Sequence, residues 1–221
     1  MNKYDICVFD LDGTLIDSLA DLADSCNEAL SVNGMPVHDT DRYKTFVGSG
    51  IKNLIKRSLL DKACDDVLVQ KVYDSFNDIY HRNCLVKTKP YLGINEMLLN
   101  LKNRGVKLCV LSNKADEFSK MITNSLFDNG TFDLVWGKKA EFPIKPDPTA
   151  LLEILTQFGV DRDRCLYIGD SDVDCITAKN AQVDFCGAEW GFRGRQELIS
   201  AGAKLIAQTP DDIVRAVLTD E

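Results

Sequence analysis

The chain has 221 residues, of which 45% are hydrophobic and 27% charged, and its formal net charge is −8. This composition is typical of a folded globular protein with room for one large domain and a smaller insertion, and it argues against a disordered chain. No apolar run approaches the roughly 20 residues that cross a bilayer, and the acidic balance disfavours binding to nucleic acid or to anionic membranes.

The eight cysteines are spread along the chain and form no Cys-x-x-Cys pair. Several lie inside apolar runs, where cysteine packs as a small hydrophobic residue. We therefore expect reduced thiols in a cytoplasmic protein, and the N-terminus lacks the pattern of a signal peptide. Only two histidines are present and neither has a ligand-like neighbour, so a zinc site and a histidine base are both disfavoured.

The first predicted element is a buried strand at residues 6–9, followed by Asp10-Leu11-Asp12-Gly13-Thr14. Residues 16–85 then show helical periodicity, with no convincing strand. Helices are expected at 18–32, 39–47, 51–60 and 65–81, with the turn Gly48-Ser49-Gly50 before the third. This segment reads as a helical bundle inserted after the first strand.

From Pro90 onward, strands alternate with helices. Strands are expected at 106–111, 132–136, 165–168, 183–186 and 205–206, and helices at 93–104, 115–127, 147–158, 172–181 and 210–218. Such alternation indicates a parallel sheet covered by helices on both faces. We therefore predict an α/β core formed by residues 1–15 and 86–221, with a helical domain at 16–85.

Polar side chains follow three of the predicted strands. They are Asp10 and Asp12, Ser112 and Asn113, and Asp170 and Asp174. A lysine, Lys145, stands before a proline at the start of the helix that precedes the last pair. Because open parallel sheets bind ligands at the carboxyl ends of their strands, we expect these side chains to form one site. Charges elsewhere lie mostly on helix faces, where solvated side chains are the default.

Carboxylates with room for water are typical ligands of Mg²⁺. The sequence predicts that Asp10 and Asp170 hold this ion, with Asp174 binding it directly or through water. A free oxygen of Asp10 can attack phosphorus as a nucleophile. Asp12 is placed to protonate the leaving oxygen and later to deprotonate water.

Ser112, the backbone N–H of Asn113 and Lys145 would hold the transferring oxygens and neutralise their charge. Simpler interpretations exist for two of them. A serine between a strand and a helix often caps the helix. A lysine before a proline that starts a helix is often a surface residue.

Gly48-Ser49-Gly50 has two interpretations that the residues alone leave open. It is either a helix N-terminus capped by Ser49 or a loop whose backbone N–H groups bind substrate. Lys52, Lys56 and Arg57 follow at helical spacing. We favour a solvated helix face for these three over contact with a substrate carboxylate.

The motifs together resemble those of the haloacid dehalogenase superfamily, in its phosphatase branch. They are Asp10-Leu11-Asp12-Gly13-Thr14-Leu15, Leu111-Ser112-Asn113-Lys114, Lys145-Pro146 and Gly169-Asp170-Ser171-Asp172-Val173-Asp174, in the family's order. The resemblance implies a Rossmann-like core with a helical cap and Mg²⁺-dependent hydrolysis of a phosphomonoester. It further implies a phospho-aspartate on Asp10, with Asp12 as general acid/base and as a metal ligand through its backbone carbonyl.

Within this family the chain is most similar to phosphoglycolate phosphatases, which implies a small phosphorylated metabolite as substrate. The similarity rests on Thr14-Leu15-Ile16-Asp17-Ser18, Val47-Gly48-Ser49-Gly50 and Tyr91-Leu92-Gly93. A pyrophosphatase, a nucleotidase or a sugar phosphomutase of the same family remains an alternative. A non-enzymatic alternative is a phospho-accepting signalling module, although such modules place the phosphorylated aspartate on a middle strand.

Overall fold

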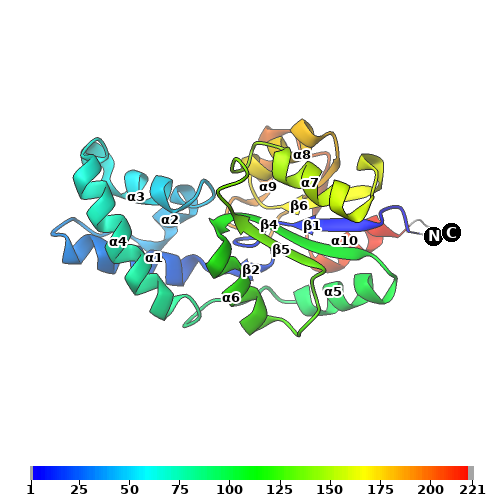
Figure 1. Cartoon of the computed structure of the whole chain (residues 1–221), viewed down its shortest axis with the longest axis horizontal. Helices are drawn as coiled ribbons and strands as arrows, with labels where there is room; N and C mark the ends of the chain where they lie inside the picture. The colour runs from blue at the N-terminus through cyan, green and yellow to red at the C-terminus, as the bar shows by residue number, and fades with distance from the viewer. Residues whose placement is uncertain (1, 219–221) are drawn as a thin grey trace. The chain divides into compact units, whose positions relative to one another are not determined.

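The computed structural model describes residues 2–218 (Figure 1). The chain divides into two compact units, a core unit formed by Met1–Ile16 with Pro90–Glu221 and a helical unit formed by Asp17–Lys89. The expected insertion was 16–85, so the unit ends later than the periodicity indicates. The reason is Asp21, whose carboxylate accepts hydrogen bonds from the backbone N–H groups of Lys87 and Thr88 and thereby ties these residues to the helices.

The core unit contains a six-stranded parallel sheet in the order β5-β4-β1-β6-β7-β8. Its strands are β1 (Ile6–Phe9), β4 (Lys107–Ala115), β5 (Leu134–Lys138), β6 (Cys165–Gly169), β7 (Asp184–Ala188) and β8 (Leu205–Ala207). Phe9, the last residue of β1, pairs with Val110 of β4 and Ile168 of β6. The carboxyl ends of these three strands therefore adjoin, and the predicted α/β class with a parallel sheet is confirmed.

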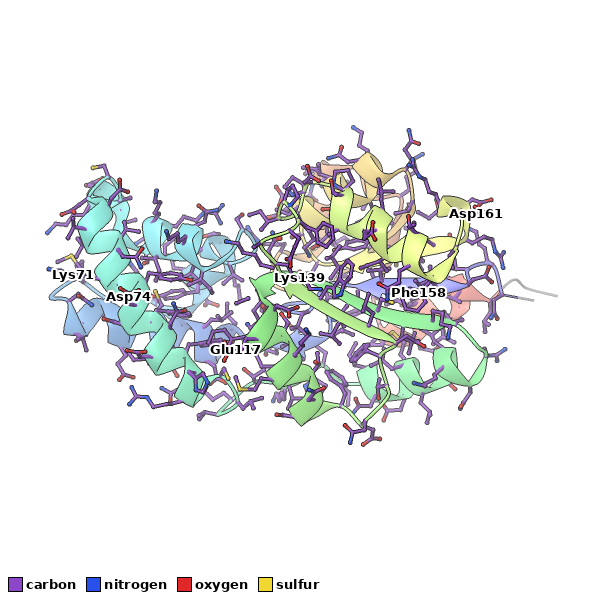
Figure 2. The ribbon with its side chains drawn as sticks, in the orientation of Figure 1. Lys71, Asp74, Glu117, Lys139, Phe158 and Asp161 are labelled. Carbon is purple, nitrogen blue, oxygen red and sulfur yellow. The ribbon has the colours of Figure 1, made fainter. Side chains whose placement is uncertain are left out.

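Helices cover the sheet on two sides (Figure 1). They are α5 (Ile94–Asn103), α6 (Asp116–Leu126), α7 (Thr149–Phe158), α8 (Asp172–Ala181), α9 (Gly194–Ala201) and α10 (Pro210–Val217). On one side, Leu151 and Ile154 of α7 pack with Ile6 and Val8 of β1 in a fully buried cluster, which Phe158 covers at the end of α7 (Figure 2). The alternate residues of the strands face the other layer of helices.

The helical unit consists of α1 (Leu19–Val32), α2 (Thr40–Phe46), α3 (Ile51–Leu59), the 3₁₀ turn Leu60–Lys62 and α4 (Asp66–Asn83). Along α4, Val72 and Phe76 are buried, whereas Lys71 and Asp74 are exposed (Figure 2). This is the period of an amphipathic helix that buries one stripe. No helix among residues 2–218 is long and apolar enough to cross a membrane.

Three local features differ from the expected elements. A short strand, β2 (Ile16–Asp17), pairs with β3 (Lys89–Pro90) where none was expected. The helix α9 was not expected, because it buries only Leu198 and so carries no apolar period. The strand β4 continues to Ala115 instead of ending at residue 111, because it pairs again with β5 after a register shift.

Candidate active site

Asp10 and Lys145 meet at the carboxyl end of β1. The backbone N–H of Asp10 donates to the carbonyl oxygen of Ile168, which continues the ladder between β1 and β6. Its carboxylate Oδ1 lies 2.8 Å from Lys145 Nζ. That ammonium also lies 2.7 Å from Asp174 Oδ1 and donates to the Tyr167 hydroxyl at 3.0 Å. Lys145 is therefore a buried cation that joins three elements, and its interpretation as a surface lysine is wrong.

Three buried carboxylates gather at this point. Oxygens of Asp10, Asp170 and Asp174 all lie within 4.8 Å of one another. Asp174 accepts a hydrogen bond from Ser171 Oγ at 2.6 Å on one oxygen and from the Tyr167 hydroxyl at 3.2 Å on the other. The three aspartates that the sequence places at two different strand ends thus form one cluster.

The electrostatics of the cluster favour a bound cation. Burial raises the pKa of Asp10 to about 7, with a smaller rise from Asp174, while Lys145 acts in the opposite direction. Burial, followed by the charges of Asp174 and Asp10, raises the pKa of Asp170 well above its usual range. Burial alone would lower the pKa of Lys145, but Asp10 and Asp174 raise it well above its ordinary value. Three carboxylates beside a single Lys145 ammonium would be relieved by a further positive charge.

The geometry around Asp170 also suits a hard metal ion. Its carboxylate accepts a hydrogen bond from the backbone N–H of Phe192 at 2.7 Å, which fixes one oxygen. Gly13, with φ +88°, and Gly191 pack so closely on Asp170 that a Cβ at either position would collide with it. Fixed carboxylate oxygens are the ligands that Mg²⁺ prefers in proteins, so the residues present fit this ion.

The Asp12 carboxylate is paired with Lys114, a different lysine from the one that contacts Asp10. Lys114 Nζ lies 2.8 Å from Asp12 Oδ1 and 3.0 Å from Oδ2. The side chains of Asp12 and Lys114 are 12% and 2% exposed. The two carboxylates of the Asp10-Leu11-Asp12 motif therefore contact different lysines.

Ser112 and Asn113 lie inside β4 and not at the start of a helix. The residue that precedes α6 is Ala115, so the interpretation of Ser112 as its N-cap is wrong. The Asn113 side chain donates to the Lys145 carbonyl oxygen at 3.0 Å and accepts from the Lys145 N–H at 2.8 Å. This pair of hydrogen bonds holds the backbone of Lys145 against β4 and so positions its ammonium.

Gly48, Ser49 and Gly50 belong to the helical unit, as do all residues between 17 and 89. The residue that precedes α3 is Gly50, and no side chain caps this helix. Ser49 Oγ instead accepts a hydrogen bond from Arg57, whose guanidinium also donates to the carbonyl oxygens of Thr45 and Phe46. The N-cap interpretation of Ser49 is wrong. Lys52, Lys56 and Arg57 are all exposed, as expected for a solvated helix face, and Arg57 in addition holds the loop through these hydrogen bonds.

Several polar groups of the site were not assigned a role from the sequence. They are the Lys114 ammonium, the Tyr167 and Ser171 hydroxyls, the Phe192 N–H and the Trp190 indole, which donates to the Thr14 carbonyl oxygen at 3.0 Å. Lys114 and Ser171 stand within motifs, so a signal existed for them. Tyr167 looks like an apolar strand residue, and Phe192 acts through its backbone, which leaves no trace in the sequence.

Comparisons with known protein families, sequences and structures all give the same family for this chain. The family profile of haloacid dehalogenase-like hydrolases matches residues 7–188. A phosphoglycolate phosphatase of Aquifex aeolicus is 35% identical over 93% of this chain and 90% of its own, and one of Colwellia psychrerythraea is 30% identical over 97% of both. A crystal structure of a candidate phosphoglycolate phosphatase from Lactobacillus delbrueckii superposes with a TM-score of 0.92 at 34% identity, covering 99% of this chain and 100% of the other.

The family match covers most of the chain, and the first relatives are covered nearly end to end. The predicted resemblance is thus confirmed, and the chain belongs to the haloacid dehalogenase-like hydrolase family, in its phosphatase branch.

Proposed function

We propose that the protein hydrolyses a small phosphomonoester of the phosphoglycolate class, in a Mg²⁺-dependent reaction that passes through a phospho-aspartate on Asp10. The observation that carries this proposal is the buried cluster in which Lys145 contacts Asp10 and Asp174 while Asp170 lies within reach. Phosphoryl transfer through a covalent intermediate needs a nucleophile and positive charge near the phosphoryl oxygens, and this cluster has a carboxylate, a fixed cation and a set of metal ligands. The substrate class is supported by the names of the relatives.

Asp10, Asp170 and the backbone carbonyl of Asp12 would hold the metal ion. Asp174 is better suited to an indirect part, because Lys145 and Tyr167 contact its Oδ1 and Ser171 contacts its Oδ2. When bound, Mg²⁺ supplies positive charge that stabilises the phosphoryl oxygens.

In the first step, Asp10 Oδ2 attacks phosphorus, since Lys145 engages Oδ1. The new bond joins Asp10 to phosphorus while the bond from phosphorus to the leaving oxygen breaks, and the Asp12 carboxyl gives its proton to that oxygen. The Lys145 ammonium, the Ser112 hydroxyl and the Asn113 N–H stabilise the charge on the transferring oxygens. The product alcohol leaves, and the phosphoryl group stays on Asp10.

In the second step, the Asp12 carboxylate takes a proton from water as the water oxygen attacks phosphorus. The bond between Asp10 and phosphorus breaks, inorganic phosphate forms, and Asp10 and Asp12 return to their starting states. A phosphomutase would instead pass the phosphoryl group to a second sugar hydroxyl, so the release of inorganic phosphate distinguishes the two activities.

We also propose that Gly48, Ser49 and Gly50 bind substrate, as their sequence motif predicts. Two features support this. Gly48 and Gly50 have φ values of +110° and +82°, which strand-like or helical residues do not adopt, and Arg57 holds the loop in this shape.

The test is a phosphate-release assay with wild-type protein and with Asp10→Asn, using phosphoglycolate, pyrophosphate, nucleotides and hexose phosphates, each with Mg²⁺ or with EDTA. We expect Mg²⁺-dependent turnover that Asp10→Asn lowers by at least about 10³-fold, because the carboxamide cannot act as a nucleophile. Asp5→Asn is the matched control, since Asp5 stands just before the other end of β1 and pairs with Arg164. An Asp10→Asn variant with wild-type turnover would contradict the mechanism, whereas a preference for pyrophosphate would contradict only the substrate class.

A further inference from the structure

Lys114 is a buried lysine for which the reaction described above gives no role. Its side chain is 2% exposed, and its ammonium donates to both oxygens of Asp12 at 2.8 and 3.0 Å. An ammonium removed from water is costly unless it is paired, so this contact is a required part of the folded site. A two-point contact also restricts how the carboxylate rotates, which a single contact does not.

The backbone that carries Lys114 is held firmly. It lies in β4, and its N–H donates to Ser112 Oγ at 3.3 Å. Across the strand pair, β5 approaches so closely that a Cβ on Gly137 would lie 2.6 Å from the Lys114 carbonyl oxygen. The long side chain therefore extends from a fixed base, and the position of its ammonium defines where the Asp12 carboxylate can lie.

We propose that Lys114 is a positioning residue that fixes the orientation of Asp12 for its two proton transfers. This inference rests on the proposed function, because it deepens the role of Asp12 there. When Asp12 gives its proton to the leaving oxygen it becomes a carboxylate, and the adjacent ammonium stabilises that charge. When water attacks, the same carboxylate takes a proton back and is still held in the same direction.

Each of the two carboxylates in the Asp10-Leu11-Asp12 motif thus contacts a lysine of its own. Lys145 contacts Asp10, where the phosphoryl group is carried, and Lys114 contacts Asp12, where the proton is moved. Removing Lys114 should therefore slow the reaction most for substrates whose leaving oxygen must receive a proton. The basicity of the leaving oxygen is the variable that measures this.

The test compares wild type, Lys114→Met and Lys114→Arg on phenyl phosphate, whose leaving oxygen needs a proton, and on p-nitrophenyl phosphate, whose leaving oxygen needs it much less. For Lys114→Met we expect kcat/KM on phenyl phosphate to fall by about 10²-fold, the size of a general-acid contribution. The fall on p-nitrophenyl phosphate should be less than about tenfold, and Lys114→Arg should recover part of the loss on phenyl phosphate. Lys107→Met is the matched control, since Lys107 pairs with Asp133 at the opposite end of the same strand.

The outcomes separate the inference from the function on which it rests. Equal losses on the two esters, or no loss on either, would overturn the role of Lys114 and leave the phosphatase proposal in place. A wild-type protein that releases phosphate from neither ester nor from phosphoglycolate would overturn the proposed function and this inference with it. If Lys114→Met does not fold, as judged by circular dichroism, Lys114→Arg alone decides, because a loss confined to phenyl phosphate supports the inference and an equal loss contradicts it.

Discussion

The core unit and the helical unit both bury aspartates, but the surroundings of the buried carboxylates differ. In the helical unit, Asp21 is 2% exposed and accepts hydrogen bonds from the N–H groups of Lys87 and Thr88 and from the Thr88 hydroxyl, at 2.7–3.0 Å. In the core unit, carboxylate oxygens of Asp10, Asp170 and Asp174 lie within 4.8 Å of one another. Asp21 is satisfied by its donors and serves the fold. The core carboxylates crowd one another, and that is the condition under which a carboxylate is available for chemistry.

Loss of Lys145 should give the largest effect on the core side of this comparison. We expect Lys145→Met to lower kcat/KM for the preferred phosphoester by about 10³-fold, because the variant removes a fixed charge beside the phosphoryl oxygens. Lys179→Met, which removes an exposed lysine from the far end of α8, should leave turnover unchanged. Steady-state kinetics measures both, and turnover of Lys145→Met within tenfold of wild type would show that its ammonium acts only on the fold.

Loss of Asp21 should lower the stability of the fold and leave the chemistry of the core site intact. We expect Asp21→Ala to lower the free energy of unfolding by about 2–4 kcal/mol, since it leaves the N–H groups of Lys87 and Thr88 without their acceptor. The Mg²⁺-dependence of turnover in the folded fraction should be retained. Urea denaturation measures the stability.

The matched control for Asp21 lies on the same helix. Asp24 contacts the Lys87 ammonium at 2.6 Å, but both side chains are more than half exposed. Exposed ion pairs contribute little to stability, so Asp24→Ala should leave the denaturation midpoint nearly unchanged. If Asp21→Ala and Asp24→Ala shifted the denaturation midpoint equally, the burial of Asp21 would give it no greater part in stability than the exposed Asp24.

The pH dependence of metal binding sharpens the comparison further. The pKa of Asp10 is raised to about 7, so without a metal ion this carboxyl is protonated below pH 7 and ionised above it. A metal ion must displace that proton, and the titration of Asp10 alone should therefore lower Mg²⁺ affinity by about tenfold between pH 8 and pH 6. Isothermal titration calorimetry in two buffers of different ionisation enthalpy measures the affinity and the proton release. An affinity that does not change over this range would contradict a role for Asp10 as a ligand.

The sequence predicts the core well because its signals are local. Apolar runs define the strands, and the polar residues that follow them mark the edge of the sheet where Asp10, Asp170 and Asp174 meet. These are properties of a few consecutive residues, and the parallel arrangement of the strands then brings them together.

The features that the sequence did not reveal depend on partners far away in the chain. Lys114 and Lys145 are buried against carboxylates from other elements, and although both lysines stand within motifs, neither motif indicates which carboxylate its lysine contacts. Asp21 lies on a helix face where a charge is ordinarily solvated, and the N–H groups that donate to its carboxylate stand 66 and 67 residues later. The extension of β4 to Ala115 follows from its pairing with β5.

The two short strands β2 and β3 have a consequence for how such proteins diversify. The helical unit leaves the core at Ile16–Asp17 and returns at Lys89–Pro90, and these two segments are hydrogen-bonded neighbours. A replacement segment spliced between them needs only two ends at the spacing of paired strands, about 4.8 Å. Recombination at this joint can therefore exchange the entire helical unit while the sheet and its cluster of aspartates and lysines are inherited unchanged.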